Sequence, residues 1–276
     1  MSGKLRLAGV IGHPISHSKS PRLHGHWLKR YGIDGHYIPM NVAPDDLART
    51  IELLPQLGFA GINVTLPHKE AVTALCDEIT PRAKAVGAVN TVIFQEDGSI
   101  LGDNTDGYGF MANLYAGAPN WRANTGPAVV LGAGGAARGV VAALLDAGAP
   151  QIILSNRTVE RATALQSEFG ARVVVSAWDD VGDAIKGANL LVNTTSLGMD
   201  GQPALPVSLD HLGPETLVTD IVYAPLKTQL LIDAAARGCA VVDGLGMLLH
   251  QAAPGFETWF GQKPIVDDEL RDAVLS

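Results

Sequence analysis

The stretch Val129-Val130-Leu131-Gly132-Ala133-Gly134-Gly135-Ala136-Ala137 decides the fold of this chain. Its apolar start predicts a buried strand, and the residues after the glycines predict a helix over 136–147. Gly132 permits a tight turn, Gly134 lets the backbone approach a ligand closely, and the small Ala137 allows the helix to pack on the strand. This order is typical of a dinucleotide-binding unit, with the pyrophosphate at the helix N-terminus, although such a turn can also bind nothing. The residues expected to contact a dinucleotide are Gly132, Ala133, Gly134, Gly135 and Ala136.

The next predicted strand, 152–155, is followed by Asn156-Arg157-Thr158 and supports the same interpretation. Enzymes that bind NAD usually carry Asp or Glu there, because a carboxylate binds the ribose hydroxyls. A carboxylate would repel a 2′-phosphate, whereas a guanidinium forms charge-assisted hydrogen bonds with it. The sequence therefore predicts NADP rather than NAD, bound through Asn156 and Arg157. Thr158 is expected to cap the next helix and to place Arg161 in its first turn, beside the same phosphate or as a solvated charge.

The composition disfavours several classes of function. The chain has 276 residues, 47% of them hydrophobic, which is enough for two domains of ordinary size. Its 20 basic and 28 acidic residues give a net charge of −8, which argues against a nucleic-acid surface. Neither the first residues nor any later stretch has the apolar run of a signal peptide or of a membrane span. We expect a cytoplasmic protein whose two cysteines, Cys76 and Cys239, are reduced and structural.

Short apolar runs alternate with helical periodicity along the chain, which predicts an α/β fold with mainly parallel sheets. We interpret it as two doubly wound domains with an active-site cleft between them: a substrate-binding α/β domain (1–108 plus 247–276) and a Rossmann NADP-binding domain (109–246). The strands expected in the first domain are 5–11, 36–42, 58–66, 88–94 and 100–101. Those expected in the second are 128–131, 152–155, 172–175, 190–193, 217–220 and 240–242, the six strands of a full dinucleotide-binding sheet. Helices are expected in and around the first domain at 21–31, 44–57, 69–76, 246–260 and 267–275.

Lys69 ends the run Gly61-Ile-Asn-Val-Thr-Leu-Pro-His-Lys69, directly after an apolar strand pattern. It stands at the opening of a predicted helix, where a cation opposes the helix dipole, so a chemical task would explain its presence. Farther along, Gly102-Asp-Asn-Thr-Asp106-Gly closes another strand and offers a carboxylate. We interpret Lys69 and Asp106 as a proton-transfer pair, and a salt bridge between two loops is the structural alternative.

A polar face is predicted at the end of the strand that precedes Lys69. Asn63 and Thr65 alternate along this strand, so their side chains share one face. The opposite face is expected to be buried through Ile62, Val64 and Leu66. A polar face at the carboxyl end of a strand suits a ligand crevice in an α/β sheet.

Further motifs follow one another along the chain. They are Ile11-Gly-His-Pro-Ile-Ser16-His-Ser18-Lys-Ser-Pro21, Gly87-Ala-Val-Asn90-Thr, Asn193-Thr-Thr195-Ser196-Leu-Gly198-Met199, Asp220-Ile221-Val-Tyr223 and Gly244-Leu-Gly-Met247-Leu-Leu-His-Gln251-Ala. Together with the glycine-rich turn, Asn156-Arg157-Thr158 and the blocks that contain Lys69 and Asp106, they resemble the shikimate dehydrogenase family. The resemblance covers essentially the whole chain.

The resemblance implies reversible, NADPH-dependent reduction of 3-dehydroshikimate to shikimate, a step of chorismate and aromatic amino-acid biosynthesis. In this interpretation Lys69 protonates the alkoxide that forms when hydride reaches the carbonyl carbon. Ser16, Ser18 and Tyr223 would hold the substrate carboxylate. The ring hydroxyls would be held by Asn63, Thr65, Asn90, Asp106 and Gln251. The cofactor contacts implied beyond the glycine-rich turn are Thr195, Ser196, Met199, Ile221, Gly244 and Met247.

Other functions fit part of the pattern. A quinate/shikimate dehydrogenase with broader substrate or cofactor use is the nearest, although Arg157 disfavours NAD. Methylenetetrahydrofolate dehydrogenase shares a related two-domain plan but is not expected to carry the paired serines with Asp106 and Gln251. A non-catalytic NADP-binding regulator is a different class, against which Lys69 and Asp106 argue. We expect a small-molecule substrate, no nucleic acid, no membrane, and a monomer or homodimer. No metal site is expected, because these histidines lack partners at metal-binding spacing: His13, His17, His24 and His26.

Overall fold

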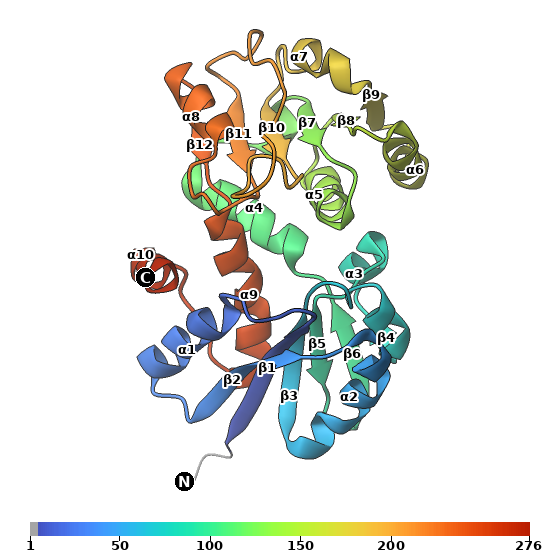
Figure 1. Ribbon diagram of the computed structural model, residues 1–276, viewed down its shortest axis with the longest axis vertical. Helices are drawn as coiled ribbons and strands as arrows, with labels where there is room; N and C mark the ends of the chain where they lie inside the picture. Colours follow the sequence, from blue (N-terminus) through green and yellow to red (C-terminus); the bar gives the residue numbers. More distant parts are fainter. Residues whose placement is uncertain (1–4) are drawn as a thin grey trace. The chain divides into compact units, whose positions relative to one another are not determined.

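The computed structural model describes residues 5–276, which form two compact units (Figure 1). Unit 1 comprises the chain up to Thr105 and again Leu249–Ser276, and unit 2 is Asp106–Leu248. The sequence places the same divisions a few residues away, at 108/109 and 246/247. The first differs because helix α4 begins at Asp106, so the whole helix belongs to unit 2. Residues 1–4, part of the segment in which no signal peptide is expected, lie outside the described residues.

Unit 1 is built on a six-stranded sheet in the order β2-β1-β3-β5-β6-β4. Strands β1, β2 and β3 pair in parallel, but β5 runs antiparallel to both β3 and β6. The sheet is therefore mixed, because only a short connection joins β5 to β6 and a parallel pair needs a long crossover. The two-residue β4 is absent from the predicted strands. The bounds are β1 Arg6–Gly12, β2 Gly35–Asn41, β3 Phe59–Val64, β4 Glu78–Ile79, β5 Thr91–Phe94 and β6 Ile100–Asp103.

Two helices predicted in unit 1 differ from those observed. The single helix expected over 44–57 is three pieces, and the last of them is separate because Pro55 has no N–H to donate and opens a 3₁₀ turn. The helix expected over 69–76 is a 3₁₀ helix that begins only at Ala71. The elements are α1 Ser20–Tyr31, η1 Pro44–Asp46, α2 Leu47–Leu53, η2 Pro55–Leu57, η3 Ala71–Leu75, α3 Pro81–Val86, α9 Leu245–Phe260 (shared with unit 2) and α10 Asp268–Leu275.

The two faces of the unit 1 sheet pack differently. Ile62 and Val64 of β3 join one apolar cluster with side chains of α2, η3 and α3, as their alternation predicts. Leu66 does not join it and is 73% exposed, because β3 ends at Val64 and the chain turns away. The other face carries aromatic rings of α1 and α9. There Trp259 Nε1 donates to Val92 O at 3.2 Å, and a Cβ on Gly61 would lie 2.0 Å from that nitrogen, so only glycine fits at residue 61.

Unit 2 is built on six parallel strands in the order β12-β11-β10-β7-β8-β9. This is the strand order of a full dinucleotide-binding sheet, which confirms the prediction. The strands are β7 Ala128–Leu131, β8 Ile152–Ser155, β9 Val173–Ser176, β10 Leu190–Asn193, β11 Leu217–Asp220 and β12 Val241–Val242. The helices are α4 Asp106–Gly117, η4 Ala123–Thr125, α5 Gly135–Asp146, α6 Val159–Phe169, η5 Trp178–Asp180, α7 Val181–Ala184 and α8 Gln229–Ala236.

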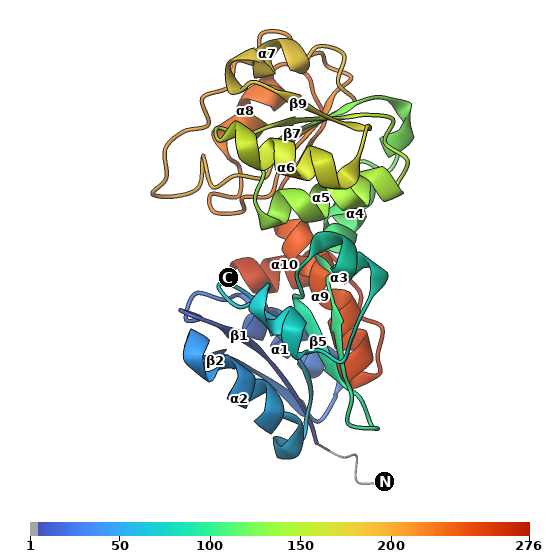
Figure 2. The ribbon, with the colours of Figure 1, turned by 90° about the vertical axis from the view of Figure 1, so that its right-hand side faces the viewer.

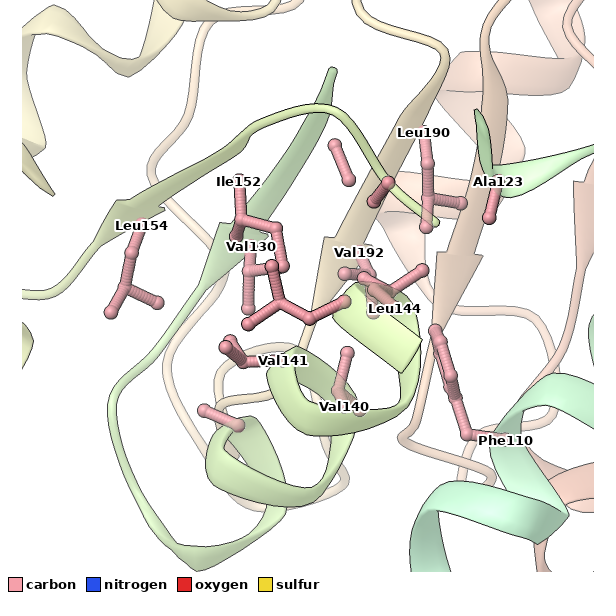
Figure 3. Packing of buried hydrophobic residues seen from close by; sticks show 14 of the residues in the cluster. Phe110, Ala123, Val130, Val140, Val141, Leu144, Ile152, Leu154, Leu190 and Val192 are labelled. Carbon is pink, nitrogen blue, oxygen red and sulfur yellow. The ribbon is translucent and has the colours of Figure 1, made fainter. Parts of the chain in front are cut away.

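Helices cover both faces of the unit 2 sheet (Figure 2). On one face, Val130 and Val192 pack with residues of α4 and α5, among them Phe110 and Leu144 (Figure 3). On the other face, alternate strand residues pack with α7, α8 and the segments beside them. Because successive residues of each strand enter different clusters, the strands are buried on both sides, which is the doubly wound arrangement predicted from the sequence.

Three general observations concern residues 5–276. No helix in this range combines the length and hydropathy needed to cross a membrane. No group of three His, Cys, Asp or Glu side chains in it is arranged to hold a metal ion. Cys76 and Cys239 are both free, and burial raises the pKa of the Cys76 thiol to about 11, so it is uncharged at neutral pH.

Candidate functional site

One edge of the unit 1 sheet collects most of the polar residues predicted to bind substrate. Parallel strands β1 and β3 end at this edge, and antiparallel β5 begins there, since Asn63 pairs with Thr91. Strand β6 also ends there, where Thr91 pairs with Asp103. The segments that follow β1, β3 and β6 therefore meet the residue that precedes β5, Asn90. These segments carry Ser16, Ser18, Thr65 and Lys69.

Lys69 lies in the turn after β3, half-buried, with its main chain fixed by residues distant in sequence. Its carbonyl accepts hydrogen bonds from Val89 N at 2.8 Å and from Thr73 Oγ1 at 3.2 Å. No α-helix begins at Lys69, so the expectation that its charge opposes a helix dipole is wrong. The bond to Val89 nevertheless ties Lys69 to the block that contains Asn90, a tie that no local pattern reveals.

Asn63 and Asn90 belong to one hydrogen-bonded network. Asn63 Nδ2 donates to Asn90 O and to Thr91 Oγ1, both at 3.2 Å. Asn90 is 5% exposed, and its Oδ1 accepts from Thr91 Oγ1 at 2.8 Å and from the N and Oγ1 of Thr105 at 2.9 and 3.1 Å. Tyr37 Oη donates to Asn63 Oδ1 at 2.7 Å. Tyr37, Thr91 and Thr105 are absent from the predicted site, because each has a polar partner that is 15 to 28 positions away in the sequence.

The serine and threonine segments take turn conformations. Ser18 N donates to Ile15 O at 3.0 Å and Ser18 Oγ accepts from Ser20 N at 3.3 Å, with Ser16 exposed between them. Thr65 N donates to Ile11 O at 2.9 Å, which fixes the residue after β3 against the end of β1. A Cβ on Gly12 would lie 2.6 Å from Thr65 Cγ2, so a side chain at residue 12 would push Thr65 out of its present position. The motif that begins at Ile11 thus shapes the turn as well as supplying hydroxyl groups.

An ion pair between Arg82 and Asp103 stabilises the main chain at this edge. Asp103, at the end of β6, is 5% exposed, accepts from Thr80 Oγ1 and Arg82 Nε at 2.6 Å each, and also accepts from Arg82 Nη2. Burial alone would raise the pKa of this carboxyl, but the bonds from Arg82 and Thr80 outweigh it and the pKa lies below its ordinary value. Asp103 O accepts from Asn90 N at 2.9 Å, so the pair holds the backbone that carries Asn90.

The remaining residues predicted for substrate and proton transfer lie elsewhere. Asp106 is the first residue of α4 in unit 2 and is 8% exposed. A Cβ on Gly107 would lie 3.0 Å from Ala143 Cβ, so a glycine lets the start of α4 pack closely on α5. Tyr223 follows β11 in unit 2, and burial raises its pKa, which keeps the phenol protonated. Gln251 is half-buried on α9 in unit 1.

The glycine-rich turn of unit 2 has the shape of an anion-binding site. Gly132 has φ 108°, which favours glycine, and a Cβ there would lie 2.6 Å from Thr194 Oγ1. Gly134 precedes helix α5 as its N-cap, without a side-chain hydrogen bond. A Cβ on Gly134 or Gly135 would meet no described atom within 4 Å, so the space in front of the helix is open to a ligand. The first N–H groups of a helix have no intrahelical acceptor, and a phosphate there would accept from them.

The segment after β8 supports this turn and carries two exposed arginines. Asn156 Oδ1 accepts from Ala133 N at 3.1 Å and its Nδ2 donates to Thr158 O at 2.8 Å, so Asn156 fixes the turn. Thr158 occupies the N-cap position of α6, but its side chain makes no capping hydrogen bond, so that expectation is wrong. Arg157 and Arg161 are exposed, with Arg161 in the first turn of α6.

The ends of β10 and β11 are joined by a buried carboxylate, Asp220, to which the sequence pattern gives no role. Asp220 Oδ1 accepts from Asn193 Nδ2 and Val222 N at 3.0 Å each, and Oδ2 accepts from Thr228 Oγ1 at 2.8 Å. Asp220 is 1% exposed, and this burial raises its pKa above the ordinary value despite the three donors. Asn193 Oδ1 in turn accepts from the N and Oγ1 of Thr195 at 3.0 and 2.7 Å. The predicted cofactor residue Thr195 is thus held by Asp220 through Asn193.

The five other predicted cofactor residues beyond the glycine-rich turn have distinct surroundings. Ser196 and Met199 are exposed in the loop after β10. A Cβ on Gly244 would lie 2.5 Å from the carbonyl of Ile221, so glycine lets the two segments touch. Met247 is 9% exposed and packs in the apolar cluster of α4 and α5, where its role in this structure is packing.

Comparisons with known proteins agree with these two units. The model of the shikimate dehydrogenase substrate binding domain matches residues 10–92. The model described as shikimate / quinate 5-dehydrogenase matches residues 119–198, and that of the shikimate 5′-dehydrogenase C-terminal domain matches residues 244–267. Shikimate dehydrogenase (NADP(+)) of Paracoccus denitrificans is 60% identical over 270 residues, which cover 98% of this chain and 96% of that protein.

Solved structures extend the similarity to the fold. Shikimate 5-dehydrogenase from Thermus thermophilus, in complex with NADP(H) and shikimate, is 39% identical with a TM-score of 0.86 and 99% of each chain covered. Quinate dehydrogenase from Corynebacterium glutamicum, in complex with NAD, is 32% identical with a TM-score of 0.91 and the same coverage. With near-complete coverage at 60% identity, this chain belongs to the shikimate dehydrogenase family of oxidoreductases.

Proposed function

We propose that this chain catalyses the reversible, NADPH-dependent reduction of 3-dehydroshikimate to shikimate. The observation that supports this most is the neutral network at the unit 1 edge, in which Asn63 and Asn90 are held by other side chains. A small ring with one carboxylate and several hydroxyls is bound selectively by such preorganised neutral groups, because an analogue that lacks a hydroxyl leaves a buried partner unpaired. The family of this chain and its relatives named for the same activity support the proposal.

In this proposal NADPH, when bound, supplies the hydride that adds to the carbonyl carbon. Lys69 donates a proton from Nζ to the carbonyl oxygen, which becomes the new hydroxyl, and Nζ regains a proton from solvent. Asp106 orients the ammonium and accepts a hydrogen bond from a substrate hydroxyl. In the oxidative direction Lys69 Nζ accepts the same proton.

We assign NADP binding to unit 2 and most of the substrate-binding residues to unit 1, with Asp106 and Tyr223 contributed by unit 2. Ser16, Ser18 and Tyr223 hold the carboxylate, and the ring hydroxyls contact Asn63, Thr65, Asn90 and Gln251. The pyrophosphate is held at the open N-terminus of α5, where Gly134 and Gly135 leave space. Arg157 and Arg161 bind the 2′-phosphate. The other proposed cofactor residues are Gly132, Ala133, Ala136, Asn156, Thr158, Thr195, Ser196, Met199, Ile221, Gly244 and Met247.

Quinate is the second candidate substrate, because the quinate dehydrogenase compared above has the same fold over nearly its whole length. The test is four kcat/KM values, for shikimate and quinate with NADP and NAD. We expect shikimate with NADP to be highest, and NADP to exceed NAD by about 10- to 100-fold, since hydrogen bonds to a charged group contribute about 1.5–3 kcal/mol. Turnover that is equal for both substrates would replace the proposal by a quinate/shikimate dehydrogenase. Retained NADP binding without turnover would identify a non-catalytic regulator.

The arginine assignment has its own matched pair of variants. Arg157→Ala should reduce the preference for NADP over NAD by about tenfold, the ratio that 1.4 kcal/mol provides, because the exposed guanidinium faces the 2′-phosphate. Arg237→Ala removes the same charge from the exposed C-terminal end of α8 and should leave the preference unchanged. Equal kcat/KM with NADP and NAD in the unaltered chain would overturn the role of Arg157.

The state of assembly and the place of action complete the proposal. We assign the chain to the cytoplasm as a monomer or homodimer. Light scattering on the purified protein at several concentrations distinguishes one copy from two, and a larger assembly would contradict the assignment.

A further inference from the structure

A buried tyrosine reaches across the unit 1 sheet to one of the proposed substrate residues. Tyr37 of β2 pairs with Ala8 of β1, and Val10 of β1 pairs with Asn63 of β3, so Tyr37 and Asn63 share one face with β1 between them. Ala8 is small, which leaves room for the phenol ring to cross β1. Tyr37 is 7% exposed, and its Oη lies 2.7 Å from Asn63 Oδ1.

The partners of Asn63 determine which way its carboxamide points. Asn90 O can only accept, so the group 3.2 Å from it must be the Nδ2 of Asn63. The second Nδ2 hydrogen is directed to Thr91 Oγ1, also at 3.2 Å. Oδ1 therefore faces Tyr37, and the tyrosine hydroxyl must be the donor. Both amide hydrogens are engaged within the protein. The buried nitrogens of His24 form no hydrogen bond with Asn63, although the carboxamide is near enough to oppose the lowering of the His24 pKa. The hydrogen-bonding capacity left for a ligand is therefore an acceptor, the second lone pair of Oδ1.

The ring of Tyr37 is itself fixed by its neighbours. It stacks on His24, with ring centroids 3.8 Å apart and an interplanar angle of 3°. His24 is fully buried, and burial lowers its pKa to about 3, so the imidazole is neutral at physiological pH. Three more rings surround His24 at centroid distances of 5.7 to 5.9 Å: Trp27, Phe256 and Trp259. Burial also raises the pKa of Tyr37, so its hydroxyl keeps the proton that it donates.

We propose that Tyr37 is a positioning residue for substrate recognition, which holds the Asn63 carboxamide so that Oδ1 accepts a hydrogen bond from a substrate hydroxyl. The inference rests on the proposed function, in which Asn63 contacts the substrate. The proposal states which ligand group Asn63 Oδ1 binds. A substrate hydroxyl donates to Oδ1, whereas a carbonyl or ether oxygen at that position would face the Oδ1 lone pair and be repelled.

The test is Tyr37→Phe, which keeps the ring on His24 and removes only the hydroxyl. The KM for shikimate should rise roughly 3- to 10-fold, the effect of one neutral hydrogen bond, with kcat and the KM for NADP nearly unchanged. Tyr31→Phe is the matched control. It removes a hydroxyl that accepts from Ile265 N at 2.9 Å in the same unit, and it should leave the KM for shikimate unchanged.

A double-mutant cycle separates positioning from a general loss of structure. In the Asn63→Ala background, Tyr37→Phe should have no further effect on kcat/KM, because the hydroxyl acts only through Asn63. Equal losses in both backgrounds, or a parallel rise in the KM for NADP, would overturn the proposal. A shikimate analogue that lacks the hydroxyl bound by Asn63 should bind more weakly than shikimate to the unaltered enzyme, and this difference should shrink in Tyr37→Phe.

A readout without substrate keeps this inference apart from the proposed function. Hydrogen exchange of the Asn63 side-chain amide, followed by NMR, should be faster in Tyr37→Phe than in the unaltered protein and in Tyr31→Phe. If shikimate is not turned over but the amide exchange responds in this way, the proposed substrate is wrong and the positioning role holds. If exchange is the same in all three proteins, the positioning role is wrong whatever the substrate.

Discussion

The two sheets of this molecule differ in the groups that they offer to a ligand at the carboxyl ends of their parallel strands. In unit 2, the segment after β7 offers main chain: Gly132 turns at φ 108°, and Gly134 opens the helix N-terminus. In unit 1, the edge offers side chains, and Asn63 is held by residues 26 to 28 positions away. The main-chain site is specified mainly by a short local sequence, with one distant support in Asn156, whereas the side-chain site depends throughout on partners brought together by the fold. Mutations should therefore affect the two edges differently.

The largest expected effect is on the unit 1 edge, where a single side chain carries the chemistry. Lys69→Ala should lower kcat by about 10²- to 10⁴-fold, the usual contribution of a general acid, with a much smaller change in the KM for shikimate. Lys84→Ala removes an exposed ammonium from α3 and should leave both constants unchanged. Steady-state kinetics measure both variants, and a change confined to KM in Lys69→Ala would refute its role as acid.

The next largest effects are expected at the glycine-rich turn of unit 2, where one substitution should lower stability and another should weaken NADP binding. Gly132→Ala should lower the free energy of unfolding by roughly 1–3 kcal/mol, because alanine at φ 108° is strained and its Cβ would lie 2.6 Å from Thr194 Oγ1. Gly134→Ala, at φ −93°, should change it by less than about 1 kcal/mol and instead raise the Kd for NADP, since its Cβ projects into the open space.

Denaturant unfolding and NADP titration test these two glycines. If Gly134→Ala binds NADP as tightly as the unaltered chain, the pyrophosphate does not lie against the start of α5. If Gly132→Ala is as stable as the unaltered chain, the turn relaxes, and the main-chain edge is less constrained than we argue.

Substitutions of Asp220 test whether the stability of the unit 2 edge also depends on side-chain hydrogen bonds. Asp220→Ala should lower the free energy of unfolding by about 3 kcal/mol, because three buried donors lose their acceptor. Asp220→Asn should change it by less than about 1 kcal/mol, since the amide oxygen keeps the bonds from Asn193 and Val222 and its NH₂ donates to Thr228 Oγ1.

The same carboxylate predicts a pH dependence. Burial raises the pKa of Asp220 in the folded state, so the folded protein binds its proton more tightly than the unfolded chain does. Its contribution to stability is therefore present at low pH and is lost as pH rises from about 4 through the folded-state pKa. The free energy of unfolding of Asp220→Asn minus that of the unaltered chain should increase with pH over this range. A constant difference would show that the pKa of Asp220 is not raised.

The sequence predicts the fold and the main-chain site well, because these depend on local patterns. The order strand, glycine turn and helix at Val129–Ala137 specifies both the Rossmann sheet and its nucleotide edge. The antiparallel β5 was missed, since alternation of apolar residues does not reveal strand direction. The prediction of a helix at Lys69 is wrong, because the helical apolar pattern there belongs to a short 3₁₀ helix.

The residues that hold the substrate-binding side chains of unit 1 in place could not be predicted individually from the sequence. Asp103 and Asp220 both lie inside recognised motifs, which was a usable signal, but nothing in their spacing reveals Arg82 or Thr228 as partners. Tyr37 stands in a strand like any other buried aromatic residue, and only the register across β1 brings it to Asn63. Such contacts depend on tertiary structure, so they are found in the folded molecule and not in a local pattern.

The smallest expected effect concerns the ion pair between Arg82 and Asp103 in unit 1. Asp103 is buried, yet hydrogen bonds from Arg82 and Thr80 lower its pKa in the folded state. Its contribution to stability is therefore full above about pH 4 and is lost as pH falls through the folded-state pKa. Because the Arg82 side chain is 45% exposed, Arg82→Ala should cost only about 1 kcal/mol at neutral pH, and this cost should shrink in acid.

Arg138→Ala is the control for Arg82→Ala, because it breaks an exposed pair with Glu168 on the surface of unit 2 and should cost less than about 0.5 kcal/mol. Asp103 O also binds Asn90 N, so Arg82→Ala should raise the KM for shikimate slightly while the KM for NADP stays constant. That asymmetry follows from the difference between the two edges, since loosening a side-chain support in unit 1 does not reach the glycine turn of unit 2. Equal changes in both KM values would show that the two edges are not independent.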